Sequence, residues 1–250
     1  MSAKINKLTI ALIALAFWIL LWEVFARFLN LGLVLPTVGE TFSALGSMII
    51  TAGFWLTVAS SFLRIFAGFI IGVVLGIALA LATQYIPFAD ALISPIMTVI
   101  RSTPVASFIM VLWVVIGSDT TPIAIAVLMI MPIIWQNLKD GFSSIDDKLS
   151  EVCLVFEVTG AKKMKLLVLP TLAKYFIPGV ITSVGLAWKS GIAAEIIAYT
   201  ANSIGKEIYL AKSYFESAEM FAWTIVVIAV SLALESIVTL LGRRLDKNGS

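Results

Sequence analysis

The sequence predicts an all-α, polytopic membrane protein with about six transmembrane helices. Of its 250 residues, 60% are hydrophobic and 13% are charged, whereas a soluble domain carries about a quarter charged residues. A spanning helix needs roughly 20 apolar residues. Apolar runs of about this length recur along the chain. One long polar stretch, residues 139–175, interrupts them. We therefore expect residues 1–250 to form a single transmembrane domain.

Several classes of function are excluded by what the sequence lacks. It contains no histidine and one cysteine, Cys153, which removes histidine-dependent metal sites and triads and any intrachain disulfide. A net charge of +2 is too small to indicate nucleic acid. No phosphate-binding loop, zinc-protease motif or nucleophile elbow is found. We expect neither catalytic residues nor a bound cofactor or metal in this chain.

The first predicted span covers residues 8–29. The alternative, a cleaved signal peptide with Ala14–Ala16 as its small-residue site, is disfavoured because the apolar run continues well beyond that point. Glu23 and Arg27 lie one helical turn apart near the end of the span. They are expected to pair or to reach the interface.

The remaining spans are expected at residues 56–82, 92–116, 122–138, 176–198 and 220–241. Thr37 and Glu40 have the spacing of a capping box and predict an interfacial helix over residues 38–51. Gly68, Gly72 and Gly76 share one helical face, which predicts close helix–helix packing. Pro95 and Pro104 interrupt the span at 92–116, and a short helix is expected around residues 206–218.

Positive charge gathers on one side of this topology. Six crossings place both termini on the side of the 139–175 loop, whereas only Arg27, Lys206 and Lys212 fall on the other side. The positive-inside rule therefore places the loop and both termini in the cytoplasm. The residues counted on that side are Lys4, Lys7, Lys139, Lys148, Lys162, Lys163, Lys165, Lys174, Arg243, Arg244 and Lys247.

Apolar residues recur at helical spacing inside the polar loop. Leu149, Val152, Cys153 and Phe156 fall on one face of a predicted helix. The alternative is that the loop is a solvated, mixed-charge connector between two spans. Such connectors rarely keep apolar residues on one helical face. We expect this face to bury against a partner.

The loop also resembles the EAA loop of ATP-binding-cassette (ABC) importer permeases, because Glu151 is followed nineteen residues later by Pro170 in a Leu-Val-Leu-Pro segment. Other segments resemble the nitrate/sulfonate/taurine-type permeases: Leu35–Thr37, Ser60–Arg64, Arg101–Pro104 and Ala187–Glu195. The resemblance implies a type I ABC importer permease fold whose loop forms a coupling helix that docks on an ATPase. The coupling residues that it implies are Glu151, Val152, Cys153, Phe156, Glu157, Gly160, Leu169 and Pro170.

The loop departs from the family pattern at two places. The usual Ala-Ala after the glutamate is Val152-Cys153, and the usual glycine six residues after the glutamate is Glu157. Gly160 is expected to supply the turn slightly later. The spacing to Leu169-Pro170 is kept.

The resemblance also implies partners and a location. They are a second copy of this chain, two cytoplasmic ATPase subunits that bind the ATP and Mg²⁺, and a periplasmic or lipid-anchored substrate-binding protein. The assembly would lie in the cytoplasmic (inner) membrane of a bacterium, in contact with lipid.

Three cations fall inside predicted spans, where a charge costs on the order of 3 kcal/mol or more. Arg64 is expected to pair with Glu23, Glu195 or Glu235. Arg101 and Lys189 either form such pairs or face a translocation path. The residues predicted to line the path are Arg101, Ser102, Trp188, Lys189 and Ser190.

These features predict a permease subunit for a small anionic solute, such as a sulfonate, taurine or nitrate. A permease for another small solute, such as a thiamine-precursor pyrimidine, is the main alternative. A secondary transporter would need acids at mid-depth for a driving ion, and a purely structural subunit would leave the intramembrane cations unexplained.

Overall fold

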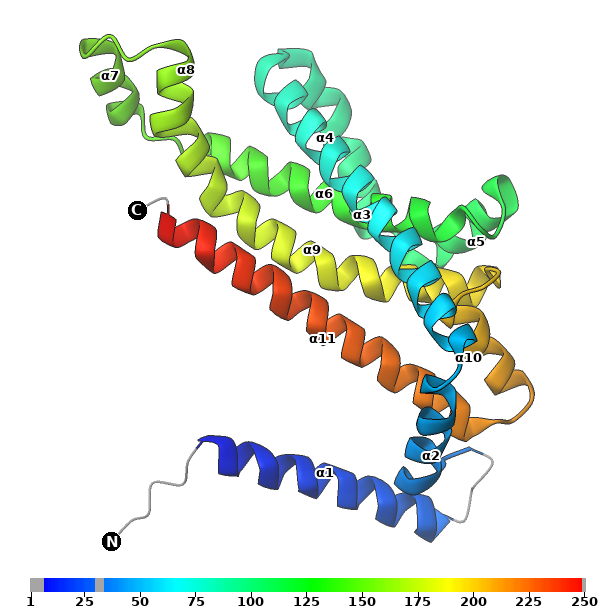
Figure 1. Ribbon diagram of the computed structural model, residues 1–250. Coiled ribbons are helices and arrows are strands. Elements are labelled where there is room, and N and C mark those ends of the chain that lie inside the picture. Colours follow the sequence, from blue (N-terminus) through cyan, green and yellow to red (C-terminus); the bar gives the residue numbers. More distant parts are fainter. Residues whose placement is uncertain (1–6, 30–33, 249–250) are drawn as a thin grey trace, which may run out of the picture.

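The computed structural model describes residues 7–29 and 34–248, which form helices and connecting turns, with no strand in those ranges (Figure 1). The predicted all-α class is confirmed. Lys4 and the side chains of Lys7, Arg243, Arg244 and Lys247, which entered the predicted charge asymmetry, lie outside what is described.

Five of the helices are long and apolar enough to cross a membrane, and a bent pair makes a sixth candidate span. The long helices run between two ends of the molecule: one carries α7 and α8, and the other carries α2 and α10 (Figure 1). We call these the α7 end and the α10 end. The elements are α1 (Lys7–Leu29), α2 (Val38–Ile49), α3 (Ala52–Tyr85), α4 (Pro87–Ser102), α5 (Val105–Ile116), α6 (Thr121–Ser143), α7 (Asp147–Val155), α8 (Gly160–Lys163), the π-helical segment η1 (Met164–Val168), α9 (Leu169–Ala198), α10 (Ile204–Ser213) and α11 (Ser217–Asn248).

The helix α1 stands apart from the bundle and is attached through its C-terminal part (Figure 1). Trp22 Nε1 donates to the carbonyl of Pro36 at 3.0 Å, and the Glu23 carboxylate accepts from Val38 N at 2.9 Å. The predicted Glu23–Arg27 pair is present at 2.6 Å. The bonds to Pro36 and Val38 attach α1 to the start of α2.

The predicted capping box begins α2. Thr37 Oγ1 accepts from Glu40 N, and Thr37 N donates to the Glu40 carboxylate. The latter bond stabilises the ionised carboxylate and lowers the pKa of Glu40 below its ordinary value. This helix therefore has a fixed starting point, as the sequence predicts.

The predicted span at 92–116 is bent rather than straight. Its two halves, α4 and α5, meet at 105° across a short break. Pro104 lacks an N–H and disfavours helical geometry in the preceding residue, and Thr103 accordingly has an extended backbone. Pro95, the other expected interruption, lies inside a continuous α4. Arg101 thus lies one residue before the end of a helix, next to the break.

The predicted glycine face packs α3 against α6. A methyl group added at Gly68 would lie 2.6 Å from the carbonyl oxygen of Ile123, and one at Gly76 would lie 2.7 Å from Ile134 Cβ. The backbones can approach this closely only because these positions lack side chains. The prediction of close packing is confirmed, and the contact lies within one chain.

The core is built around α3, α6 and α9, with α11 against α9. Large side chains of α6 and α9 fill it, including Ile130, Ile134, Trp135 and Trp188, all of which are buried. Gly179 of α9 permits a close approach to Asn137, because a methyl group there would lie 3.0 Å from its side chain.

The polar stretch 139–175 is more helical than expected. Its first residues continue α6 to Ser143. In this part of α6, Lys139 pairs with Asp90 of α4 and lies over the Trp135 ring. Its last residues belong to α9, which follows η1 without a break. Pro170 has no N–H to donate back to the preceding turn, and the widened η1 turn, with Leu169 N bonded to Met164 O, lies just before it.

Candidate functional site

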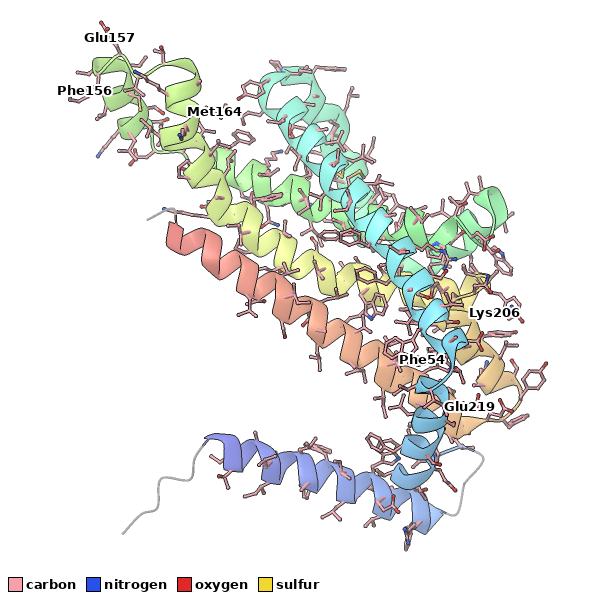
Figure 2. The ribbon with its side chains drawn as sticks, in the orientation of Figure 1. Phe54, Phe156, Glu157, Met164, Lys206 and Glu219 are labelled. Carbon is pink, nitrogen blue, oxygen red and sulfur yellow. The ribbon has the colours of Figure 1, made fainter. Side chains whose placement is uncertain are left out.

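The helix α7, at the centre of the predicted coupling loop, projects from one end of the bundle. Asp146 caps it by accepting from Lys148 N at 2.8 Å, and none of its residues is buried. Figure 2 shows Phe156 and Glu157 at the outermost tip of this end. Apolar side chains there are strongly exposed: Leu149 50%, Val152 49%, Leu154 64%, Val155 79% and Phe156 73%.

The end of α7 adopts a Schellman motif at the place where the sequence departs from the family pattern. Val158 N donates to Cys153 O at 2.7 Å, and Glu157 N donates to Leu154 O at 3.1 Å. Glu157 has a φ of +53°, in the left-handed region that favours glycine. Gly160 has a φ of +55° and begins the next turn. Glutamate therefore occupies the turn position, and Gly160 adds a second turn after it.

This geometry leaves an uncovered apolar surface on α7. An isolated helix of nine residues is marginal in water, and its exposed apolar side chains have no cover within the described part of the chain. Glu151 is exposed on the same helix. A partner with an apolar groove and a basic rim would complement these features.

A buried polar cluster closes the α10 end. Arg64 of α3 donates to Glu195 of α9 at 2.9 Å, and the Glu195 side chain is 0% exposed. The same carboxylate accepts from Ser61 Oγ at 2.8 Å and from Gly205 N at 3.3 Å. Ser61 Oγ in turn accepts from Ile204 N at 2.9 Å. The predicted pairing of Arg64 is confirmed, with Glu195 as its partner.

Lys189 forms an ion pair as well, but an open one. Its Nζ lies 3.7 Å from Oε1 of Glu235 on α11, and the two side chains are 68% and 40% exposed. Arg101 and Ser102 are also exposed, and the Ser102 hydroxyl donates to Thr98 O within α4. Among the residues that the structure describes, Arg101 forms no ion pair.

Trp188 and Ser190, the neighbours of Lys189, lie in the core. Trp188 is 1% exposed and its Nε1 donates to Val227 O at 2.9 Å, while the Ser190 hydroxyl donates to Ala187 O. In this chain both residues therefore have packing and hydrogen-bonding roles. Their contribution to a path stays a prediction.

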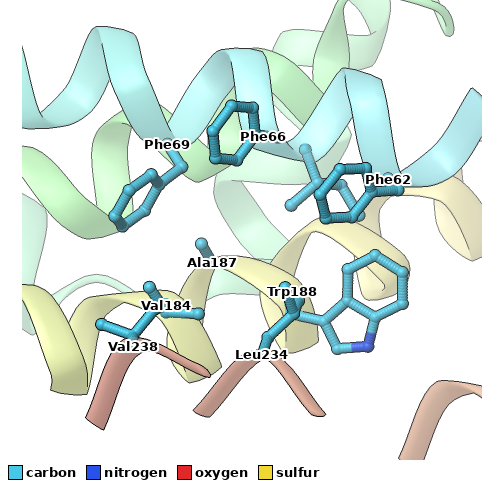
Figure 3. Close-up of a pocket in the computed structure, with 9 residues that line it drawn as sticks. Phe62, Phe66, Phe69, Val184, Ala187, Trp188, Leu234 and Val238 are labelled. Carbon is cyan, nitrogen blue, oxygen red and sulfur yellow. The ribbon is translucent and has the colours of Figure 1, made fainter. Parts of the chain in front are cut away.

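A small apolar cavity lies beside Trp188. It has a volume of about 80 Å³, and Figure 3 shows Phe62, Phe66 and Phe69 of α3 facing α9 and α11 across it. Its lining carries no charged side chain. This cavity therefore offers no counter-ion to a charged solute.

The partners of the intramembrane cations were the least predictable part of the site. Ser61 and Gly205 complete the Glu195 cluster. No sequence motif marks either residue as a partner of Glu195, and Ser61 is 134 positions away from it. Glu23, Glu195 and Glu235 are all acids near span ends that could pair with these cations. Only the packing of α9 against α11 assigns Glu235 to Lys189.

Comparison with known proteins identifies relatives of the chain. Residues 72–247 match the family described as binding-protein-dependent transport system inner membrane component. The chain is 24% identical over 235 residues to a Bacillus subtilis (strain 168) protein described as an aliphatic sulfonates transport permease, SsuC, covering 92% of this chain and 83% of the relative. It is 27% identical over 197 residues to the bicarbonate transport system permease protein CmpB of Synechococcus elongatus, covering 78% and 70%. Among solved structures, an amino acid ABC transporter matches with a TM-score of 0.60 and 16% identity, covering 78% of this chain and 93% of that one.

Proposed function

The chain belongs to the family of binding-protein-dependent transport system inner membrane components, and on that premise we propose that it conducts a small anionic solute through an ATP-driven importer. It is an ABC importer permease subunit with the fold of that class. In the proposal, separate ATPase subunits bind and hydrolyse ATP with Mg²⁺. An external binding protein delivers the solute, and both termini and α7 face the cytoplasm of a bacterium.

The helix α7 carries the proposal, because it presents unburied apolar side chains at one end of the bundle. In the assembled importer we place this helix in a groove on the ATPase. Burying a phenylalanine or leucine side chain contributes about 1.5–3 kcal/mol, and Phe156 and Leu154 are both available. Glu151 would meet basic residues at the edge of the groove.

Affinity purification of the chain from its native membrane tests the proposal. We expect an ATPase with a phosphate-binding loop to co-purify. Phe156→Ala should weaken this association, because it removes a side chain that is 73% exposed in the protomer. Glu151→Lys should reduce transport and solute-stimulated ATP hydrolysis together, because it reverses a charge at the contact.

Phe215 offers a matched control at the opposite end of the molecule. It is 69% exposed and also follows the end of a short helix, α10. Phe215→Ala should therefore leave the ATPase bound. Loss of the ATPase in both variants, or full transport by Glu151→Lys, would contradict the placement of α7 at the ATPase.

The anionic nature of the solute is supported by two features. The relatives named above are described as permeases for sulfonates and for bicarbonate, both of which are small oxyanions. Arg101 and Lys189 provide exposed cationic groups within the predicted spans. Uptake of labelled ethanesulfonate or bicarbonate into vesicles that contain the purified complex would support the proposal, whereas uptake of an uncharged pyrimidine in their place would refute it.

We propose a homodimer as the transporting unit. One copy supplies five spanning helices and a bent pair, and exposed apolar side chains cover much of α1, α4 and α5. A second copy would enclose the path and provide a docking helix for a second ATPase. Native mass measurement in mild detergent should give two copies of this chain with two ATPase subunits, and one copy with one ATPase would contradict it.

A further inference from the structure

The ion pairs that α9 makes with α3 and with α11 differ in how tightly they are closed. Arg64 and Glu195 are 2.9 Å apart, with the carboxylate fully buried. Lys189 and Glu235 are 3.7 Å apart, and both side chains are exposed in the protomer. A charge-assisted hydrogen bond has a length of about 2.7–2.9 Å, so of these two pairs the Arg64 pair reaches it and the Lys189 pair does not. The Lys189 ammonium retains hydrogen-bonding capacity for another acceptor.

The carboxylate of Glu235 is held in place by its surroundings. A methyl group at Gly185 of α9 would lie 2.4 Å from Oε1 of Glu235, so the missing side chain allows the carboxylate to lie against the α9 backbone. The Ser231 hydroxyl, one turn away on α11, donates to the same oxygen at 3.4 Å. Lys189, in contrast, carries its charge on a long flexible stem. Glu235 is the more constrained member of the pair, and Lys189 is the more exposed one.

The depth of the pair indicates that it faces water or protein. Lys189 lies nine residues before Ala198, the last residue of α9, which is ~14 Å at 1.5 Å per residue. This depth is close to the middle of a hydrocarbon core of about 30 Å. Charged side chains at such depth face a bundle interior or a water-filled cavity rather than lipid. An ammonium that is 68% exposed in the protomer therefore fits the wall of a hydrated path.

We propose that Glu235 is a specificity-determining residue: it occupies Lys189 when no solute is present, and an anionic group of the solute displaces it. The inference rests on the proposed function, in which Lys189 lines the path. A conducting site must hold its solute weakly enough to release it. Competition from a fixed carboxylate weakens the hold of Lys189 on an anion, so Glu235 sets the affinity of this step.

Chemical labelling of Lys189 in the purified permease–ATPase complex measures this site without the binding protein. A small, water-soluble amine reagent should label Lys189, as read by mass spectrometry, and ethanesulfonate should protect it. Ethanesulfonamide, which is similar in shape and uncharged, should not protect it. An exposed ion pair contributes about 0.2–1 kcal/mol. The half-protecting concentration is the concentration of ethanesulfonate that halves the labelling of Lys189. We expect Glu235→Gln to lower it by up to about fivefold, because the loss of a competing pair worth about 1 kcal/mol changes a binding constant by about that factor.

Two further variants separate competition from general damage. Gly185→Ala places a methyl group 2.4 Å from Oε1 of Glu235, which is too close for both to stay in place, and so moves the carboxylate without removing either charge. It should lower the half-protecting concentration in the same direction as Glu235→Gln. Glu195→Gln alters the closed pair, and it should lower the thermal midpoint of the complex while leaving the half-protecting concentration unchanged.

The inference is overturned if Lys189 is not labelled in the intact complex, because the pair would then be covered by protein or lipid. It is also overturned if ethanesulfonate and bicarbonate both fail to protect Lys189, or if Glu235→Gln leaves the half-protecting concentration unchanged or raises it. Vesicle uptake distinguishes this failure from failure of the proposed function. A wild-type complex that imports an anion while Lys189 stays unprotected refutes the role of the pair alone, and a wild-type complex without uptake refutes the transport proposal.

Discussion

Replacing Glu157 with glycine should stabilise the turn that ends α7. Glu157 has a φ of +53°, and the left-handed conformation costs a non-glycine residue about 1–2 kcal/mol. Glycine avoids this cost but loses about 0.4–1 kcal/mol through the greater freedom of the unfolded chain. The net gain is therefore about 0.5–1 kcal/mol, which corresponds to a two- to fivefold shift in local opening at an RT of about 0.6 kcal/mol.

Hydrogen exchange reports this opening directly. The amides of Glu157 and Val158 donate to Leu154 O and Cys153 O, the two bonds of the turn. In the purified permease, their exchange should slow by about two- to fivefold in the Glu157→Gly variant, because exchange through local opening follows its free energy. Faster exchange would refute the reasoning, since it would mean that the glutamate side chain holds the turn together.

Gly160 supplies a control of opposite sign. It has a φ of +55°, and a methyl group added there meets nothing within 4 Å, so Gly160→Ala tests backbone strain without a steric clash. This variant should destabilise the start of α8 by about 1 kcal/mol. Slower exchange in Gly160→Ala would show that positive φ does not govern this loop.

Three further predictions concern packing and ion pairs, each measured as the thermal midpoint of the purified complex. Ser61→Ala leaves Ile204 N and the Glu195 carboxylate short of a partner and should cost about 1–3 kcal/mol. Ser60 is the control, because its hydroxyl accepts one long hydrogen bond, from Arg64 at 3.5 Å, and a loss in Ser61→Ala no larger than that in Ser60→Ala would contradict this. Gly68→Ala should separate α3 from α6 and lower the thermal midpoint, because its methyl group would lie 2.6 Å from a backbone oxygen. Gly46→Ala is the control: its methyl group meets nothing within 4 Å, and the change should be neutral or stabilising by up to about 1 kcal/mol. Lys139→Ala should cost less than about 1 kcal/mol, because its pair with Asp90 is partly exposed.

Hydropathy and glycine spacing were sufficient to predict the long helices and a close packing face on α3, but not that α6 packs against this face. Both signals depend on local sequence, since a spanning run and a glycine face are each contained in one helix. The 105° bend between α4 and α5 could not be predicted in the same way. Hydropathy reports the cost of transfer into lipid and carries no information on direction, so Pro104 marks a break without giving its angle. The π-helical turn before Pro170 is a comparable case.

The sequence located the intramembrane cations but not their charge balance. Arg64 is neutralised by a residue 131 positions away, and Lys189 is paired with Glu235 on the last helix. A count of cations in the predicted spans therefore overstates the positive charge that a solute would meet. Arg101 is the predicted path cation without an ion pair in the described part of the chain. In the proposed function, the affinity for an anion would depend on how easily the Lys189–Glu235 pair opens, and the sequence alone does not identify that pair.

The two ends of the molecule differ in where their stabilising contacts come from. At the α10 end, the Glu195 carboxylate, the Ser61 hydroxyl and the amides of Ile204 and Gly205 bond one another within the chain. At the α7 end, the side chains that would stabilise a short helix by burial are exposed, Val155 and Phe156 by 79% and 73%. Burial of either side chain could contribute about 1.5–3 kcal/mol. A helix of nine residues is marginally stable in isolation, so a contribution of this size would be enough to stabilise it. This difference supports the proposal that the ATPase docks at the α7 end rather than at the self-contained α10 end.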